Sequence, residues 1–197
     1  MRKELREQWT RFPAELRRDW ETHISQKLSQ LIKILETSPQ NLFPANNLIG
    51  TYAPLESEVH WSKKLSHVFD RLAYPAFLDT GKMEFRVAHP HSLKTRSDFG
   101  VEILSPPVDA EVVTPSILIV PGLGFSEEGK RLGRGVGYYD RYLENYNGVK
   151  IGLCFEQVLR SDIILEAHDV LMDLIITEEN LFIANQNFEF LRRVRWI

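Results

Sequence analysis

The feature that most constrains this chain is the uninterrupted apolar run Ile117–Val120, which Pro121 ends. A strand with one face in water alternates apolar and polar residues, whereas a strand covered on both faces is a continuous run rich in β-branched residues. Similar runs occur at residues 149–154 and 174–177, with helical patterns elsewhere along the chain. This alternation predicts an α/β fold, a three-layer sandwich with a mostly parallel sheet flanked by helices. No compositional break divides the 197 residues, so we expect one domain over residues 1–197.

Apolar residues at helical spacing predict the helices of this sandwich. A stripe in the first 38 residues, interrupted near Pro13 and ended at Pro39, consists of Leu16, Trp20, Ile24, Leu28, Leu31, Ile32 and Leu35. After a short strand at 48–52, a second stripe of Leu65, Val68, Phe69 and Leu72 predicts another helix. Residues 82–88 alternate and predict a half-buried strand near a sheet edge, followed by a loop rich in Pro and Ser. A further helix is expected over 138–146.

Charge and cysteine content narrow the class of protein. A net charge of −3 gives no general attraction to nucleic acid or anionic lipid, so we expect neither as a partner. The chain has no apolar run near the roughly 18 residues that span a bilayer, and its first residues lead into charge, so we expect a cytoplasmic protein. The single cysteine, Cys154, lies in an apolar run and is expected to be a buried structural thiol. His89 and His91 lack a third ligand at metal spacing and are expected in a loop.

Glycine is concentrated in one segment, residues 122–140. Six of the eleven glycines fall between Gly122 and Gly137, together with Lys130, Arg131 and Arg134. Glycine lets backbone amides approach an oxyanion closely, and the segment links a buried strand to a predicted helix whose free N–H groups favour phosphate. Ligands of open α/β sheets bind beyond the carboxyl ends of the strands, where this segment would lie. We therefore expect a phosphate-holding loop.

Two common phosphate motifs do not fit this segment. Residues 124–130 match the first part of a Walker loop, but Arg131 stands where Ser or Thr should ligate magnesium. The dinucleotide pattern needs a glycine where Tyr138 stands. Residue types alone leave a solvated surface loop as an alternative, and they allow Asp140 to be only an acidic residue that stabilises a helix N-terminus. Tyr138 and Tyr139 cannot share one helical face, so one of them is expected in the core.

The sequence RLGRGVGYYD at 131–140, after Val120-Pro121-Gly122, resembles the signature of the 5-formyltetrahydrofolate cyclo-ligase family. Weaker features of the same family occur in the expected order along practically the whole chain: Leu5-Arg6, Glu58-Val59, Pro75, Met83-x-Phe85, 152–157, His168-Asp169 and 175–177. The resemblance implies an enzyme that phosphorylates the formyl oxygen of 5-formyltetrahydrofolate with ATP. The neighbouring folate nitrogen then closes the methenyl ring, and ADP and phosphate are released.

The resemblance also implies the site residues. ATP would be bound by Arg2, Lys3, Glu4, Leu5, Arg6, Arg131, Leu132, Gly133, Arg134, Gly135, Val136, Gly137, Tyr138 and Tyr139. The folate substrate would be bound by Ala53, Glu58, Arg134, Gly135, Val136, Gly137 and Tyr138, and Arg131, Arg134 and Tyr138 would be catalytic. Mg²⁺ would lie between Asp140 and Asp169, as suits a cation that keeps several waters and bridges phosphates. We expect a monomer whose partners are 5-formyltetrahydrofolate and ATP.

Three positions depart from the family pattern. Arg2 stands where lysine is common, and Ser105 stands where a glutamate often precedes Pro106. Ser126 stands where an aspartate usually follows Phe125. If a carboxylate at either serine position is catalytic in the family, activity here would be reduced. A non-catalytic nucleotide- or folate-binding relative is therefore the alternative to an enzyme. An RNA-binding module is less compatible with the negative net charge.

Overall fold

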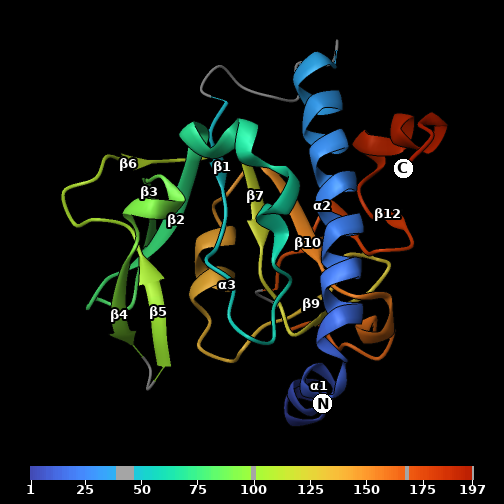
Figure 1. Ribbon diagram of the computed structural model, residues 1–197, viewed down its shortest axis with the longest axis horizontal. Helices are drawn as coiled ribbons and strands as arrows, with labels where there is room; N and C mark the ends of the chain where they lie inside the picture. Colours follow the sequence, from blue (N-terminus) through green and yellow to red (C-terminus); the bar gives the residue numbers. More distant parts are fainter. Residues whose placement is uncertain (39–46, 99–100, 167–168, 197) are drawn as a thin grey trace.

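The computed structural model describes residues 1–38, 47–98, 101–166 and 169–196, and its main element is an eight-stranded sheet. The strand order is β12-β11-β10-β7-β1-β2-β3-β6. In that order the strands are Leu181–Ile183, Leu174–Ile176, Val149–Leu153, Ile117–Val120, Ile49–Gly50, Leu72–Phe77, Met83–Val87 and Val112–Val113. The strands from β11 to β2 run parallel, and antiparallel strands β12, β3 and β6 complete the two sides (Figure 1). The mostly parallel sheet is confirmed.

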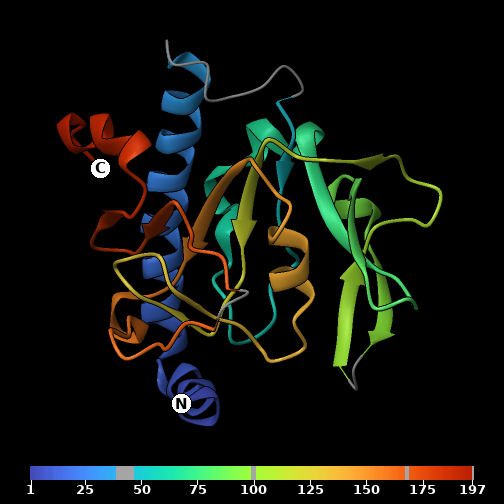
Figure 2. The same ribbon diagram turned by 180° about the vertical axis from the view of Figure 1, so that it is seen from behind.

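The central strands are the apolar runs that the sequence singled out. All four residues of β7 are buried, and β10 and β11 are buried at every position but Lys150. Helix α2 (Ala14–Thr37) and two 3₁₀ helices cover one face of the sheet, whereas α3 (Tyr138–Leu143) covers the other (Figure 1 and Figure 2). Apolar cover on both faces explains why these strands show no alternation. The sheet and the helices on its two faces together form the three layers.

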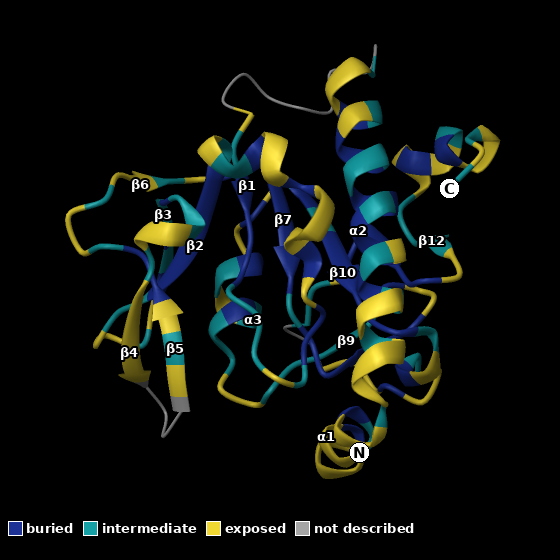
Figure 3. Ribbon diagram, in the orientation of Figure 1, coloured by how far each residue is buried: buried dark blue, intermediate teal, exposed yellow. Residues whose placement is uncertain are grey.

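The N-terminal helix pair confirms the predicted interruption at Pro13. Helix α1 (Arg2–Arg11) ends before Phe12, whose extended φ of −71° and ψ of 127° match the restriction on a residue that precedes proline. Helix α2 then buries most of the predicted stripe, and the residues coloured as exposed lie along the side of the helix that faces away from the sheet (Figure 3). Leu16 is the exception, because 39% of it is exposed. Helix α2 ends at Thr37, and Pro39 lies outside the described residues.

Two predictions about the middle of the chain are wrong. The stripe from Leu65 to Leu72 forms 3₁₀ helices Trp61–Lys64 and Ser66–Arg71, and Leu72 opens strand β2. The supposed loop after β3 contains a hairpin of β4 (Lys94–Asp98) and β5 (Val101–Ser105), which stands apart from the main sheet (Figure 1). Helix α3 is also shorter than expected, because it ends at Leu143 rather than Tyr146.

Parallel pairing creates a switch point between β1 and β7. The chain passes from β1 to β2 on one side, and from β7 to β10 and β11 on the other. Segments that leave β1 and β7 therefore diverge at their carboxyl ends, which is where open α/β sheets bind ligands. No helix among the described residues is long and apolar enough to cross a membrane. Cys154 is fully buried, as expected.

Gly129 and Gly81 both have a positive φ, +84° and +77°, but only Gly129 is crowded. A comparison of the two positions therefore separates the cost of backbone strain from the cost of crowding. A Cβ at Gly129 would lie 2.4 Å from the carbonyl oxygen of Met172, whereas a Cβ at Gly81 would meet nothing within 4 Å. We predict that Gly81→Ala lowers the free energy of unfolding by about 1–2 kcal/mol through left-handed strain alone. Gly129→Ala should cost roughly 2–5 kcal/mol because overpacking is added. Urea unfolding measures the free energy of unfolding of both variants. Equal losses of stability would contradict the additional cost of crowding at Gly129.

Candidate active site

A pocket of about 260 Å³ opens at the carboxyl ends of β1, β2 and β7. The glycine-rich segment supplies Pro121, Gly122, Arg131, Gly133, Arg134, Val136, Gly137, Tyr138, Tyr139 and Asp140 to its wall. The rest of the wall consists of Arg6, Tyr52, Ala53, Leu55, Glu58, Pro75, Phe77, Ile103 and Leu104. The pocket therefore lies at the switch point between β1 and β7, as the topology requires.

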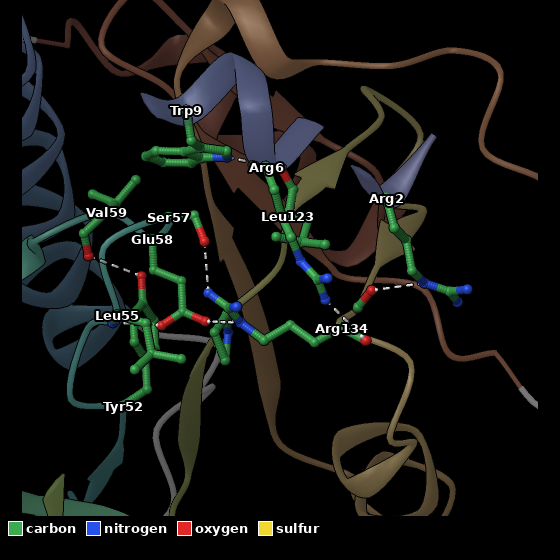
Figure 4. Close-up of polar contacts among 12 residues, drawn as sticks. Arg2, Arg6, Trp9, Tyr52, Leu55, Ser57, Glu58, Val59, Leu123 and Arg134 are labelled. Atoms are coloured by element: carbon green, nitrogen blue, oxygen red, sulfur yellow. Dashed lines mark hydrogen bonds and ion pairs between the residues drawn. The ribbon is translucent and has the colours of Figure 1, made fainter. Parts of the chain in front are cut away.

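Arg134 and Glu58, 76 positions apart in sequence, form an ion pair in this pocket (Figure 4). The Nε of Arg134 donates to Oε1 of Glu58 at 2.8 Å, and its Nη2 donates to the hydroxyl of Ser57 at 2.8 Å. The other carboxylate oxygen of Glu58 accepts from the backbone N–H of Leu55 at 2.9 Å. Only 6% of the Glu58 side chain is exposed, whereas 30% of the Arg134 side chain is, so the pair is shielded from solvent on its carboxylate side. Shielding strengthens a charge pair whose groups are also hydrogen-bonded.

Two tyrosines in the wall keep their protons. Burial first, and then the Glu58 carboxylate, raise the pKa of Tyr52 and of Tyr139 well above its ordinary value. The Tyr52 hydroxyl donates to the carbonyl of Val59 at 3.1 Å. The buried Tyr139 hydroxyl has no hydrogen-bond partner among the described residues. Because buried hydroxyls are normally paired, the Tyr139 hydroxyl is a suitable hydrogen-bond donor to a bound ligand.

Arg131 and Asp140, predicted to contact phosphate and metal respectively, are paired with each other. Nη2 of Arg131 donates to Oδ1 of Asp140, and Nη1 donates to the carbonyl of Pro121 at 3.0 Å. The guanidinium also lies 5.7 Å from the centre of the Tyr139 ring. Only 6% of the Arg131 side chain is exposed. The carboxylate of Asp140 thus does more than favour the helix N-terminus, because it holds a buried cation at the pocket.

Helix α1 packs against the glycine-rich segment, although more than 110 positions separate them (Figure 4). Nε of Arg2 donates to the carbonyl of Gly133 at 3.1 Å, and Nη2 of Arg6 donates to the carbonyl of Arg134 at 3.5 Å. The indole N–H of Trp9 donates to the carbonyl of Leu123 at 3.1 Å, inside the core. The structure therefore brings the cations of α1 to the predicted phosphate loop.

The other predicted site residues differ in their placement. Ala53 and most of residues 131–140 line the pocket, but Leu132 and Gly135 do not. Lys3 is 93% exposed, Glu4 pairs with Arg160 at 2.9 Å, and Leu5 is fully buried in the core. A ligand could reach Leu5 only through its backbone. The roles assigned to these residues remain predictions.

Asp169, the second predicted metal ligand, does not line the pocket. Its Oδ2 accepts from the backbone N–H of Glu166 at 2.7 Å, in a local turn. Its neighbour in the family motif, His168, lies outside the described residues. Across the described parts of the chain, no three His, Cys, Asp or Glu side chains group as a metal site.

The two serines that depart from the family pattern lie outside the pocket wall. Ser126 is buried, its hydroxyl accepts from the N–H of Lys130 at 3.2 Å, and its carbonyl accepts from the N–H of Gly129 at 3.0 Å. It thereby closes the turn between β8 (Gly124–Phe125) and β9 (Arg131–Leu132). Ser105 is buried at the end of β5. The two serines themselves therefore do not contribute to the pocket wall.

Sequence reasoning missed part of the apolar wall of the pocket. Phe77 ends β2, a strand that the sequence pattern did not predict, and Ile103 and Leu104 lie on the β4–β5 hairpin, which it assigned to a loop. Leu55 and the hydroxyl of Ser57 escaped notice because the loop before the first 3₁₀ helix shows no periodic pattern. No local signal in the sequence indicated that these residues share a pocket.

A pocket at the switch point of a parallel sheet, walled by a glycine-rich loop that carries two arginines, is typical of α/β enzymes. The chain belongs to the 5-formyltetrahydrofolate cyclo-ligase family, whose model matches residues 1–178. The Mycoplasma pneumoniae protein named 5-formyltetrahydrofolate cyclo-ligase is 29% identical over 163 residues, covering 80% of this chain and 87% of that protein.

Other relatives agree with this family. The NMR structure of Aquifex aeolicus 5,10-methenyltetrahydrofolate synthetase matches with a TM-score of 0.73 and 27% identity, covering 94% of this chain and 91% of that one. A mouse 5-formyltetrahydrofolate cyclo-ligase is 37% identical over 70 residues, covering 32% of this chain. The chain aligns with about a third of the length of the mouse relative and of two yeast relatives, 34%, 38% and 32%.

The hydrogen bond from Trp9 should anchor α1 at the pocket. We predict that Trp9→Phe, which keeps an aromatic ring but leaves the buried carbonyl of Leu123 unpaired, lowers the free energy of unfolding by about 1–3 kcal/mol. Urea unfolding followed by circular dichroism gives the value. Trp20→Phe is the matched control, because Trp20 also packs against Phe155 but its indole N–H has no hydrogen bond among the described residues. If both variants lose the same free energy of unfolding, the hydrogen bond of Trp9 does not anchor α1.

Proposed function

We propose that this chain is an ATP- and Mg²⁺-dependent enzyme that cyclises 5-formyltetrahydrofolate to 5,10-methenyltetrahydrofolate, with release of ADP and phosphate. The observation that carries the proposal is the pocket that joins Glu58, Arg134, Arg131 and Asp140 in a chain of this family. The names of the Mycoplasma pneumoniae and Aquifex aeolicus relatives describe the two sides of the same conversion.

The chemistry explains why such a pocket needs cations. The formyl oxygen of an amide-like group is a poor leaving group, so it must be activated before the folate nitrogen can displace it. Transfer of the terminal phosphoryl group of ATP to that oxygen gives a phosphorylated formyl intermediate and ADP. Attack by the neighbouring nitrogen on the formyl carbon then closes the ring, and the oxygen departs with the phosphate. Fixed positive charge stabilises the transferring phosphoryl group.

The arginines of the pocket suit this reaction because they are already in place. Arg131 is held by Asp140 and the carbonyl of Pro121, and Arg134 by Glu58 and Ser57. Donors held in position before the reaction need little reorganisation in the transition state. We assign phosphate contacts to both arginines, with Arg2 and Arg6 of α1 on the ATP side of the loop. Tyr138, which packs edge-on against Phe77 at 4.9 Å, would stack on the flat substrate.

Glu58 suits the folate side of the pocket. Its carboxylate is buried next to two protonated tyrosines and close to Ala53 in the wall. A buried carboxylate accepts hydrogen bonds from the N–H groups of a pterin strongly, since charge-assisted bonds gain in a shielded site. Glu58 would thus orient the substrate while it positions Arg134.

The acidic residues fit a magnesium ion that is bound largely through phosphate oxygens. Mg²⁺ usually keeps several waters and uses one or two carboxylates, so a cluster of three protein ligands is not required. Asp140 supplies a carboxylate in the pocket wall and is the residue we assign to the metal, with Asp169 as the second candidate. The ion would offset negative charge on the phosphates. We further propose that the chain acts as a single-domain monomer in the cytoplasm.

The direct test mixes the protein with 5-formyltetrahydrofolate and Mg-ATP and follows the absorbance of the methenyl product. We predict turnover by the wild type, and a kcat/KM for Glu58→Gln that is lower on the order of a hundredfold, because the variant leaves the Arg134 cation unpaired in a shielded site. Glu84→Gln is the control, since Glu84 pairs with Arg86 at 2.6 Å outside the pocket wall. That variant should keep wild-type activity.

Two results would count against the proposal. A folded wild-type protein that gives no methenyl product would refute the catalytic function, and retained binding of ATP and folate would then favour the non-catalytic relative. Equal activity in Glu58→Gln and Glu84→Gln would leave the reaction standing but remove Glu58 from the site.

A further inference from the structure

The loop at residues 51–60, between β1 and the first 3₁₀ helix, carries both side chains that hold Arg134 (Figure 4). Two hydrogen bonds join the ends of this loop to each other. The hydroxyl of Tyr52 donates to the carbonyl of Val59 at 3.1 Å, and the indole N–H of Trp61 donates to the carbonyl of Tyr52 at 2.9 Å. Further contacts that fix the loop come from α2.

Helix α2 contacts the loop on both sides of residues 57–58, which hold the arginine. On one side, Nη2 of Arg17 donates to the carbonyl of Glu56 at 2.8 Å. On the other side, Oε1 of Glu21 accepts from the backbone N–H of His60 at 3.3 Å. Residues four positions apart lie on the same side of a helix, so α2 holds the loop at two points with neighbouring side chains.

Glu21 is a charged residue in the middle of α2, yet only 6% of its side chain is exposed. Its second carboxylate oxygen pairs with Nζ of Lys63 at 3.1 Å. The same Nζ donates to the carbonyl of Arg18 at 2.8 Å, which ties the first 3₁₀ helix to α2. A carboxylate is costly to bury unless it is paired and hydrogen-bonded. Since Glu21 lies outside the pocket wall, its bonds serve the loop and not a ligand.

We propose that Glu21 is a positioning residue of the active site, which acts through the backbone of His60 to hold Glu58 where it pairs with Arg134. This inference rests on the proposed function, in which Arg134 contacts phosphate. Only Val59 lies between His60 and Glu58, and its side chain is fully buried, so a shift of His60 moves Glu58 as well. A misplacement of about 1 Å at an active site can lower the rate on the order of a hundredfold.

Turnover of 5-formyltetrahydrofolate tests the effect on the reaction. We expect Glu21→Ala to lower kcat/KM about tenfold, because the N–H of His60 loses its acceptor. Glu21→Gln keeps an oxygen in the same position and should stay within about threefold of the wild type. Glu36→Ala is the matched control, since Glu36 also lies on α2 but pairs with Arg71 at 2.7 Å, outside the pocket wall. That variant should keep wild-type activity.

A measurement without ligand separates positioning from a general loss of stability. The Nε–H of Arg134 is bonded to Glu58, so its exchange with solvent reports how well that bond is held. Its NMR signal is assigned by its absence from Arg134→Lys. We expect Glu21→Ala to speed this exchange about tenfold, and Glu36→Ala to leave it unchanged. Glu21→Met, which keeps the volume but lacks an acceptor, replaces Glu21→Ala if that variant does not fold.

Two results would overturn the role of Glu21 while the proposed function stands. One is an activity of Glu21→Ala equal to that of Glu36→Ala. The other is a loss of activity in Glu21→Ala without faster exchange at Arg134, because Glu21 would then only stabilise the fold. If the wild type makes no methenyl product, the proposed function has failed, and the assignment of Glu21 to an active site falls with it.

Discussion

The site depends on the parallel pairing of β1 with β7 in the middle of the sheet. Gly50 of β1 is paired with Leu118 of β7, and a Cβ at Gly50 would lie 2.3 Å from Cδ2 of Leu118, so a larger residue there would force the neighbouring side chains to shift. The pairing also places the ends of two strands with opposite connections side by side, and so it opens the crevice into which Tyr52, Ala53 and Gly122 project. The glycine-rich segment can serve as a wall of that crevice only because β7 delivers it there.

Within the crevice, electrostatic partners fix the arginines before any ligand arrives. Glu58 and Asp140 each hold one guanidinium, and backbone carbonyls of the loop hold the arginines of α1. Only Arg131 among these arginines is nearly buried, with 6% of its side chain exposed, and its guanidinium would destabilise the fold without a partner. In the proposed function, the bonds that order the loop also hold its cations in position for phosphate. Stability and proposed function therefore share one network in this protein.

The sequence pattern predicted the buried strands well and the half-buried elements poorly. Both faces of the strand Ile117–Val120 are buried, so all of its residues are apolar, and this pattern can be read from the sequence alone. Strand β2 was not predicted because its first residue, Leu72, continues the helical spacing of Leu65, Val68 and Phe69, so the strand start was assigned to the end of a helix. The β4–β5 hairpin escaped because its strands pair mainly with each other and lie exposed, so burial imposed no clear alternation on them.

By itself, the sequence determined the fold class and the family resemblance, and it predicted a phosphate-holding loop at residues 122–140, because local composition and spacing carry each of these inferences. The tertiary structure decided which residues meet. It paired Arg134 with Glu58 and Arg131 with Asp140, and it brought α1 to the loop. Such pairings depend on strand order and on packing between segments far apart in the chain, and no local pattern of residues encodes them.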